Sequence, residues 1–281
     1  MPVFLEALAG YAFLQNAWVA GVLASIGCGV MGSYVVVKRI GFLAGGIAHA
    51  VLGGMGIAYY FGRSPIAGAL LAAMLAALII GWVKLRWQEH EDTLIAALWS
   101  VGMAIGIVFI SQTPGYNVDL MSYLFGNILM VSRRDLFLMG GLDVVIVLSV
   151  LLFRKQFLAV AFDEEFARVR SVHVEFFYLL LLCLVALTVV LLVQVVGLIL
   201  VMALLTLPAA IAGQYVASLG RIMVLAVLLG IAFTSGGLAV SYQPDLPTGA
   251  TIILLAGGTY LLSTLGAALR KRWLRGPQAG F

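Results

Sequence analysis

The pattern with the most chemical content in this sequence lies between residues 41 and 53. Gly41, Gly45, His49 and Gly53 recur at every fourth position of an apolar stretch, so in an α-helix they share one face. Small residues at this spacing let two helix backbones approach closely inside a membrane. An imidazole there is costly unless it meets a hydrogen-bonding partner, water or an ion. We therefore predict a helix-packing face of Gly41, Gly45 and Gly53 with His49 as a metal ligand. The alternative is a structural histidine bonded to a neighbouring helix carbonyl.

Two carboxylates are further candidate metal ligands. Asp143 lies eight residues after Asp135, where an apolar span is predicted to begin, which is about 12 Å along a helix axis. It could line a water-filled path, or the helix could start later and leave it near the surface. Asp245 lies in a turn before the last apolar run. In the alternative reading of this turn, Asp245 or Thr248 caps a helix whose first turn contains Pro247.

The motifs of the common hydrolytic enzymes are missing from the sequence. None of the four lysines ends the G-x-x-x-x-G-K-[ST] pattern of a P-loop. H-E-x-x-H, G-x-S-x-G and paired cysteine ligands do not occur either. We therefore expect a protein that is not an enzyme, does not hydrolyse ATP through a P-loop and binds no cofactor of its own.

The elements that must position these residues are membrane spans. The chain has 281 residues, of which 63% are hydrophobic and only 10% are charged, whereas soluble domains carry about 25% charged residues. A span needs roughly 20 apolar residues, and lipid offers no partner to unpaired backbone groups. Residues 1–281 are thus expected to form a single all-α, polytopic transmembrane domain with about 8–10 spans. The predicted spans are near 18–37, 42–61, 65–85, 93–111, 135–153, 176–194, 196–213, 221–242 and 248–269.

Basic residues predict the orientation, because they are enriched in cytoplasmic loops. Under this layout 13 of the 16 basic residues fall on one side, and only Arg63, Arg133 and Arg134 fall on the other. The segments 154–175 and 208–221 and the C-terminus are then cytoplasmic, and 112–134 faces outward. The expected location is the inner (cytoplasmic) membrane. This bias also accounts for the net charge of +4 without a nucleic-acid partner.

Five segments, in the right order, resemble the permeases of zinc, manganese and iron ABC importers. They are Lys38-Arg39 with His49-Ala50 ten residues on, 120–128 (LMSYLFGNI), 162–172 (FDEEFARVRSV), 197–221 (GLILVMALLTLPAAIAGQYVASLGR) and 246–250 (LPTGA). A looser similarity extends to the cobalamin and siderophore importer permeases, whose fold is therefore expected here.

The resemblance implies a set of partners. They are a second copy of the chain with a pathway along the dimer axis, two cytoplasmic ATPase subunits, an extracytoplasmic metal-binding protein and membrane lipid. It also implies an ATPase-docking segment after the Pro-Ala-Ala motif, at Pro208, Ala209, Ala210, Gly213 and on to Arg221. One position departs from the family pattern. Many members carry Asp four residues before the motif histidine, where this chain has Gly45.

The expected function is the permease subunit of an ATP-driven importer of divalent metal ions, zinc first and manganese or iron as alternatives. The missing carboxylate at Gly45 favours a second hypothesis, a permease of the same architecture that carries a metal chelate. A third is a stand-alone, proton-coupled secondary transporter in which Asp143 and His49 relay protons.

Overall fold

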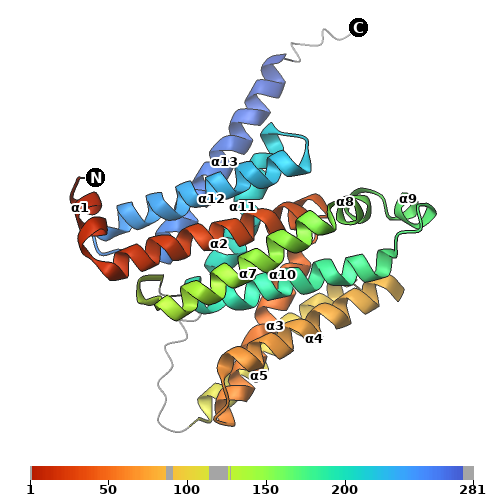
Figure 1. Ribbon diagram of the computed structural model, residues 1–281, viewed down its shortest axis with the longest axis horizontal. Helices are drawn as coiled ribbons and strands as arrows, with labels where there is room; N and C mark the ends of the chain where they lie inside the picture. The colour runs from red at the N-terminus through yellow and green to blue at the C-terminus, as the bar shows by residue number, and fades with distance from the viewer. Residues whose placement is uncertain (1, 87–90, 114–125, 127, 275–281) are drawn as a thin grey trace.

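The computed structural model describes residues 2–86, 91–113, 126 and 128–274, and every regular element within them is a helix (Figure 1). The all-α prediction is therefore confirmed. The described elements are α1 (Pro2–Gly10), α2 (Ala12–Val37), α3 (Gly41–Tyr60), α4 (Pro65–Arg86), α5 (Glu91–Ser111), the 3-10 turn η2 (Ile128–Met130), α7 (Arg133–Leu152), α8 (Arg154–Phe162), α9 (Glu164–Val169), α10 (Val174–Val196), α11 (Leu198–Tyr215), α12 (Leu219–Tyr242) and α13 (Thr248–Leu274).

Eight of the described helices are long and apolar enough to cross a membrane, namely α2, α3, α4, α5, α7, α11, α12 and α13. A further apolar helix, α10, runs through the middle of the bundle (Figure 1). Its apolar stretch extends over Val174–Val190. This confirms the predicted polytopic membrane protein with about eight to ten spans.

Helix ends follow local chemistry. The long apolar run from 176 to 213 breaks at Gly197, which has φ +81° between α10 and α11, a conformation that glycine adopts readily. At the other end of the chain, α2 begins at Ala12, earlier than the predicted residue 18. Two polar residues are accommodated there because Gln15 donates to the carbonyl of Ala9 (3.2 Å) and Asn16 to that of Val131 (3.4 Å).

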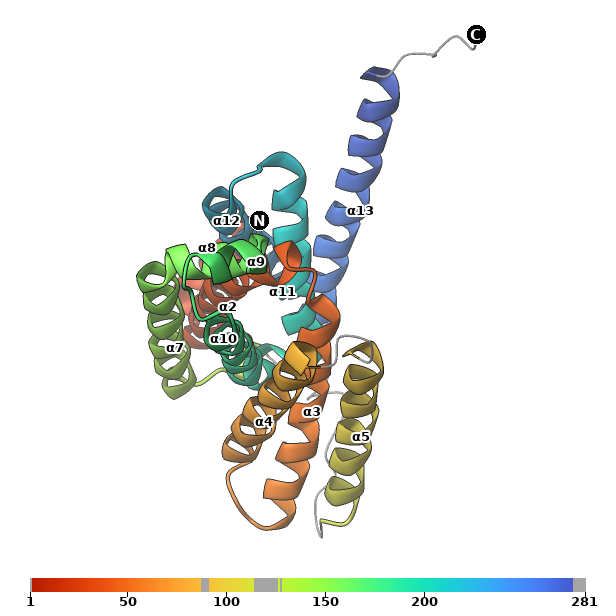
Figure 2. The ribbon, with the colours of Figure 1, turned by 90° about the vertical axis from the view of Figure 1, so that its right-hand side faces the viewer.

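The helices form two groups with α10 between them. On one side, α2 packs against α7, α11 and α12, and on the other, α3 packs against α4 and α5. Figure 2 shows α7 at the left edge of the bundle and α5 at the right, with α10 and α4 between them. Residues carried by α7 and by α3 are therefore held far apart, which decides how the candidate ligands can combine.

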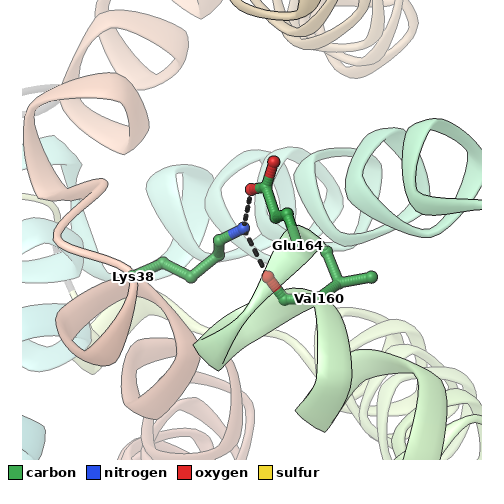
Figure 3. A network of polar contacts seen from close by, with 3 residues as sticks. All are labelled: Lys38, Val160 and Glu164. Carbon is green, nitrogen blue, oxygen red and sulfur yellow. Dashed lines mark hydrogen bonds and ion pairs between the residues drawn. The ribbon is translucent and has the colours of Figure 1, made fainter. Parts of the chain in front are cut away.

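A buried lysine joins the segments that were predicted to lie on the cytoplasmic side. Lys38, at the end of α2, donates to Glu164 Oε1 of α9 (2.6 Å) and to the carbonyl oxygen of Val160 in α8 (2.7 Å; Figure 3). The guanidinium of Arg154, which begins α8, lies near Gly220 at the start of α12. Three basic connections thus gather at one end of the bundle, as the predicted orientation requires.

The connections between helices are described to different extents. The charged segment after α7 folds as α8 and α9, and Asp163 caps α9 by accepting from the backbone N–H of Phe166 (2.9 Å). The predicted external-loop motif at 120–128 lies outside the described residues except for Gly126 and Ile128.

Candidate functional site

His49 lies in α3 with its ring stacked on the indole of Trp99 in α5. The ring centroids are 4.0 Å apart and the planes differ by 13°. Its Nδ1 atom is buried and has no hydrogen-bond partner within the described part of the chain. The carbonyl partner that a structural histidine would use is not seen at this nitrogen. Nδ1 can therefore offer a lone pair to a cation, or a proton to water.

Close packing of glycines on two helices places His49 beside Trp99. A Cβ atom at Gly53 would lie 2.8 Å from the carbonyl oxygen of Gly102, and one at Gly102 would lie 2.8 Å from the Cα of Ala50. The backbones of α3 and α5 therefore touch where small residues meet. Gly56 and Gly106 continue this contact one turn further on. We call this contact between the two backbones the α3–α5 seam. It positions the stacked rings of His49 and Trp99, which lie one helical turn away.

The other two glycines of the predicted face meet different neighbours. A Cβ at Gly45 would lie 3.5 Å from both the Met202 methyl carbon and the Trp99 ring, which is ordinary van der Waals contact. A Cβ at Gly41 would come no closer than 3.9 Å to Thr206. Gly53 therefore lies in the α3–α5 seam, and Gly41 faces a side chain of α11. Gly45 faces side chains of both α11 and α5.

Asp143 is buried elsewhere in the bundle. Its helix, α7, begins at Arg133, and the residue is only 8% exposed. The carboxylate occupies a notch left by Gly27 of α2, where a Cβ would lie 2.8 Å from Oδ1. Oδ2 has no hydrogen-bond partner among the described residues. Asp143 thus lies against Gly27 of α2, whereas His49 lies against Trp99 of α5, and α10 contacts both α7 and α3. The two residues therefore have different neighbours and do not form one site.

Asp245 lies in the exposed turn between α12 and α13, with φ +52°. The turn is closed by the backbone N–H of Leu246, which donates to the carbonyl of Ser241 (3.1 Å), and by a contact between the hydroxyls of Ser241 and Thr248 (3.1 Å). The three candidate ligands thus come from three separate places. Within the described residues, no group of three or more His, Cys, Asp or Glu side chains could hold a metal ion.

The predicted ATPase-docking segment is partly buried. Pro208 and Ala209 lie inside α11 and are buried, and the helix continues through the proline to Tyr215. Gly213 and Arg221 are exposed, and a Cβ at Gly213 would meet nothing within 4 Å. The surface available to a partner is therefore the end of α11 and the short connection to α12. The end of α11 is held against α13 by two side-chain hydrogen bonds. One joins Tyr215 to Ser263 (2.9 Å), and the other joins Gln214 to Thr264 (3.2 Å).

Trp99 and Met202 were not identified from the sequence. A signal for Trp99 was present, because Gly102 and Gly106 in the same predicted span form a G-x-x-x-G pattern, which is typical of closely packed membrane helices. That pattern could have indicated α5 as the partner of the small-residue face of α3. Met202 carries no comparable signal, since a methionine in an apolar run fits core packing equally well.

Comparison with known proteins agrees with this architecture. The ABC 3 transport family model matches residues 10–267. A membrane protein of Synechocystis sp. is 49% identical over 253 residues, covering 90% of each chain. The manganese transport system membrane protein MntC of Halalkalibacterium halodurans is 35% identical over 263 residues, covering 94% of this chain and 90% of the relative.

Solved structures give the same result. The PsaBC complex of Streptococcus pneumoniae with a Fab contains a chain that superposes with a TM-score of 0.84 at 33% identity, covering 93% of this chain and 94% of that one. An inward-facing structure described as a metal-chelate type ABC transporter shares the fold, with a TM-score of 0.71 at 13% identity over 95% of this chain and 89% of that one. The chain therefore belongs to the ABC 3 transport family, the non-catalytic membrane components of metal ABC importers that its sequence motifs resemble.

Proposed function

We propose that the chain is the permease subunit of an ATP-driven importer of Zn²⁺ or a similar divalent ion, and that the ion passes His49. The supporting observation is the imidazole of His49, whose Nδ1 has no hydrogen-bond partner within the described residues. His49 is carried by α3, and small residues allow α3 to pack closely against both α4 and α5. A passing cation needs only weak ligation, because an ion held tightly would not leave.

The surroundings of His49 favour zinc. Zn²⁺ accepts imidazole readily, whereas Mn²⁺ is better served by carboxylate and water. The neighbours found here are an indole and, at Gly45, a thioether side chain, and position 45 supplies no carboxylate. Manganese is the second candidate, since the Halalkalibacterium relative is named for manganese transport.

The partners would be those of an ABC importer. We infer a second copy of the chain, two cytoplasmic ATPase subunits and an extracytoplasmic metal-binding protein. The ATPase would contact the exposed surface from Gly213 to Arg221, on the same side as the connections joined by Lys38. ATP-driven motion at that surface would open the pathway past His49 alternately to the two sides.

The direct test is uptake by reconstituted transporter. Proteoliposomes containing the chain, its ATPase and its metal-binding protein should take up radioactive Zn²⁺ only with ATP. His49→Ala should abolish most of this uptake without loss of assembly. His173→Ala is the matched control, because His173 is exposed at the start of α10. Equal uptake by His49→Ala would place the ion path elsewhere, and uptake by the chain alone without ATP would favour the secondary-transporter hypothesis.

The orientation can be tested separately. We infer that the chain lies in the inner membrane with its basic connections on the cytoplasmic side. In this orientation α9 and the C-terminus are also cytoplasmic. A cysteine introduced at exposed Arg168, in a background without Cys28 and Cys183, should react with a membrane-impermeant maleimide only after the cells are opened. Labelling in intact cells would reverse the orientation.

A further inference from the structure

An apolar groove of about 470 Å³ lies between α3 and α4, at the end where the two helices are joined. Its floor is the closest approach of the two backbones, where a Cβ on Gly54 would collide with Gly68 and with the side chain of Ala72. Because no large side chain can enter there, the space above the floor stays open. Its volume is in the range of pockets that bind small ligands.

The rim of the groove faces away from the bundle. Phe61 and Leu71 are each 66% exposed, and Leu75 is 58% exposed. In a chain of membrane spans, side chains of this kind meet lipid or another subunit. Leu75 lies ten residues into α4 from Pro65, which is about 15 Å along the helix axis. That length is half of the roughly 30 Å hydrocarbon core, so the groove extends through about one leaflet.

The mouth of the groove carries a positive charge. Arg63 lines the groove in the turn between α3 and α4, beside Ser64. The side chain is exposed, and no ion pair is formed by it within the described part of the chain. The sequence has no Asp or Glu between residues 7 and 88. The charge is also unusual in its location, since only two other basic residues, Arg133 and Arg134, fall on this side in the predicted layout.

The groove is apolar, extends through about one leaflet and ends at an arginine. These two features complement the two parts of a phospholipid, its acyl chain and its phosphate. A guanidinium binds phosphate oxygens through paired, charge-assisted hydrogen bonds, and the apolar walls would cover a hydrocarbon chain. We propose that this groove binds one anionic phospholipid, with an acyl chain between α3 and α4 and the phosphate at Arg63. The site is separate from the ion path, so it does not depend on which metal is carried.

Native mass spectrometry of the purified full-length chain, titrated with phosphatidylglycerol, tests the proposal. Wild type should retain one lipid per chain. Arg63→Gln should bind about fivefold more weakly, in line with the ~1 kcal/mol that one basic residue contributes near an anionic surface. Arg133→Gln is the matched control, because Arg133 is exposed at the start of α7 and does not line the groove. Equal weakening in the two variants would overturn the phosphate assignment.

A second variant tests the acyl part of the site. Ala67 lines the groove and is exposed, so Ala67→Trp should fill the space without disturbing the core. It should lower retention of phosphatidylglycerol and phosphatidylcholine alike, whereas Arg63→Gln should affect mainly the anionic lipid. Unchanged retention in Ala67→Trp would overturn the groove assignment. Efficient cross-linking between two copies through Leu71→Cys in native membranes would also overturn it, because the occupant would then be a second chain.

Discussion

The imidazole of His49 and the indole of Trp99 lie face to face, with 4.0 Å between ring centroids. This relationship joins two helices that are distant in the sequence and leaves the nitrogen atoms at the ring edge clear of the stacking partner. Stacking fixes the plane of the imidazole and therefore the direction in which its nitrogens point. An indole face also attracts a nearby positive charge more strongly than other aromatic rings do. Trp99 is therefore placed to orient His49 and to stabilise it when it carries a cation.

Removing the indole should weaken metal transport. Trp99→Leu keeps an apolar side chain but loses the stacked face, which contributes about 0.5–1.5 kcal/mol for aromatic pairs. We expect half-maximal uptake to need several-fold more Zn²⁺, with Trp99→Phe close to wild type. Uptake by proteoliposomes over a range of Zn²⁺ concentrations measures this. The control is Trp82→Leu, since Trp82 is 52% exposed on α4. If Trp99→Leu and Trp82→Leu behaved alike, the stacking would have no role in transport.

Two glycine substitutions should shift stability in opposite directions. Alanine is favoured over glycine in a helix by about 1 kcal/mol, so Gly141→Ala in α7, where nothing lies within 4 Å of the new Cβ, should stabilise the chain. Gly102→Ala would bring its Cβ to 2.8 Å from the Cα of Ala50. Because two backbones must then separate, we expect a loss of about 1–3 kcal/mol. Thermal unfolding in detergent measures both, and stabilisation by Gly102→Ala would show that the α3–α5 seam is loose.

The sequence was sufficient to predict the spans, because the length of an apolar run is set by the bilayer and can be counted along the chain. The break at Gly197 was predictable for a similar reason, since a glycine in an overlong apolar run offers a conformation that other residues avoid. The start of α2 was not. Residues 3–16 were too short and too polar to predict a span with certainty, although they were long enough for a helix in the membrane interface. The hydrogen-bond partners of Gln15 and Asn16, which are Ala9 and Val131, are known only from the folded chain.

The candidate site was predicted only in part. His49 and its small-residue face follow from spacing within one helix, whereas the pairing of α3 with α5 depends on contacts between distant segments. Asp143 shows the same limit. Its depth in a helix could be counted, but the notch at Gly27 that receives it lies on another helix. For this reason the sequence could not tell that Asp143 and His49 are separated by α10.

The ion pair at the end of α2 should hold α9 against the bundle. The side chain of Lys38 is 8% exposed and that of Glu164 is 40% exposed, so the pair is partly shielded from water. Glu164→Gln removes the charge of one partner, while Lys38 keeps its bond to the Val160 carbonyl. We expect a modest loss, about 1 kcal/mol, and faster proteolysis between α8 and α10. Glu165→Gln changes the neighbouring carboxylate and should leave the cleavage rate unchanged. Identical rates in the two variants would mean that α9 is held by its apolar contacts alone.

The last prediction concerns the end of α11. Gly213 is exposed and a Cβ there meets nothing within 4 Å, so Gly213→Trp should fold and insert normally as an isolated chain. If this surface contacts the ATPase, an indole will hold the two subunits apart. Transport should then fall sharply while the partner still hydrolyses ATP, because hydrolysis would no longer be transmitted to the pathway. Gly141→Trp is the matched control, since Gly141 is equally unobstructed but lies within the span α7. Measuring ATP hydrolysis and Zn²⁺ uptake on the same proteoliposomes separates loss of coupling from loss of assembly. Normal ATP-driven uptake by Gly213→Trp would exclude this surface as the docking site.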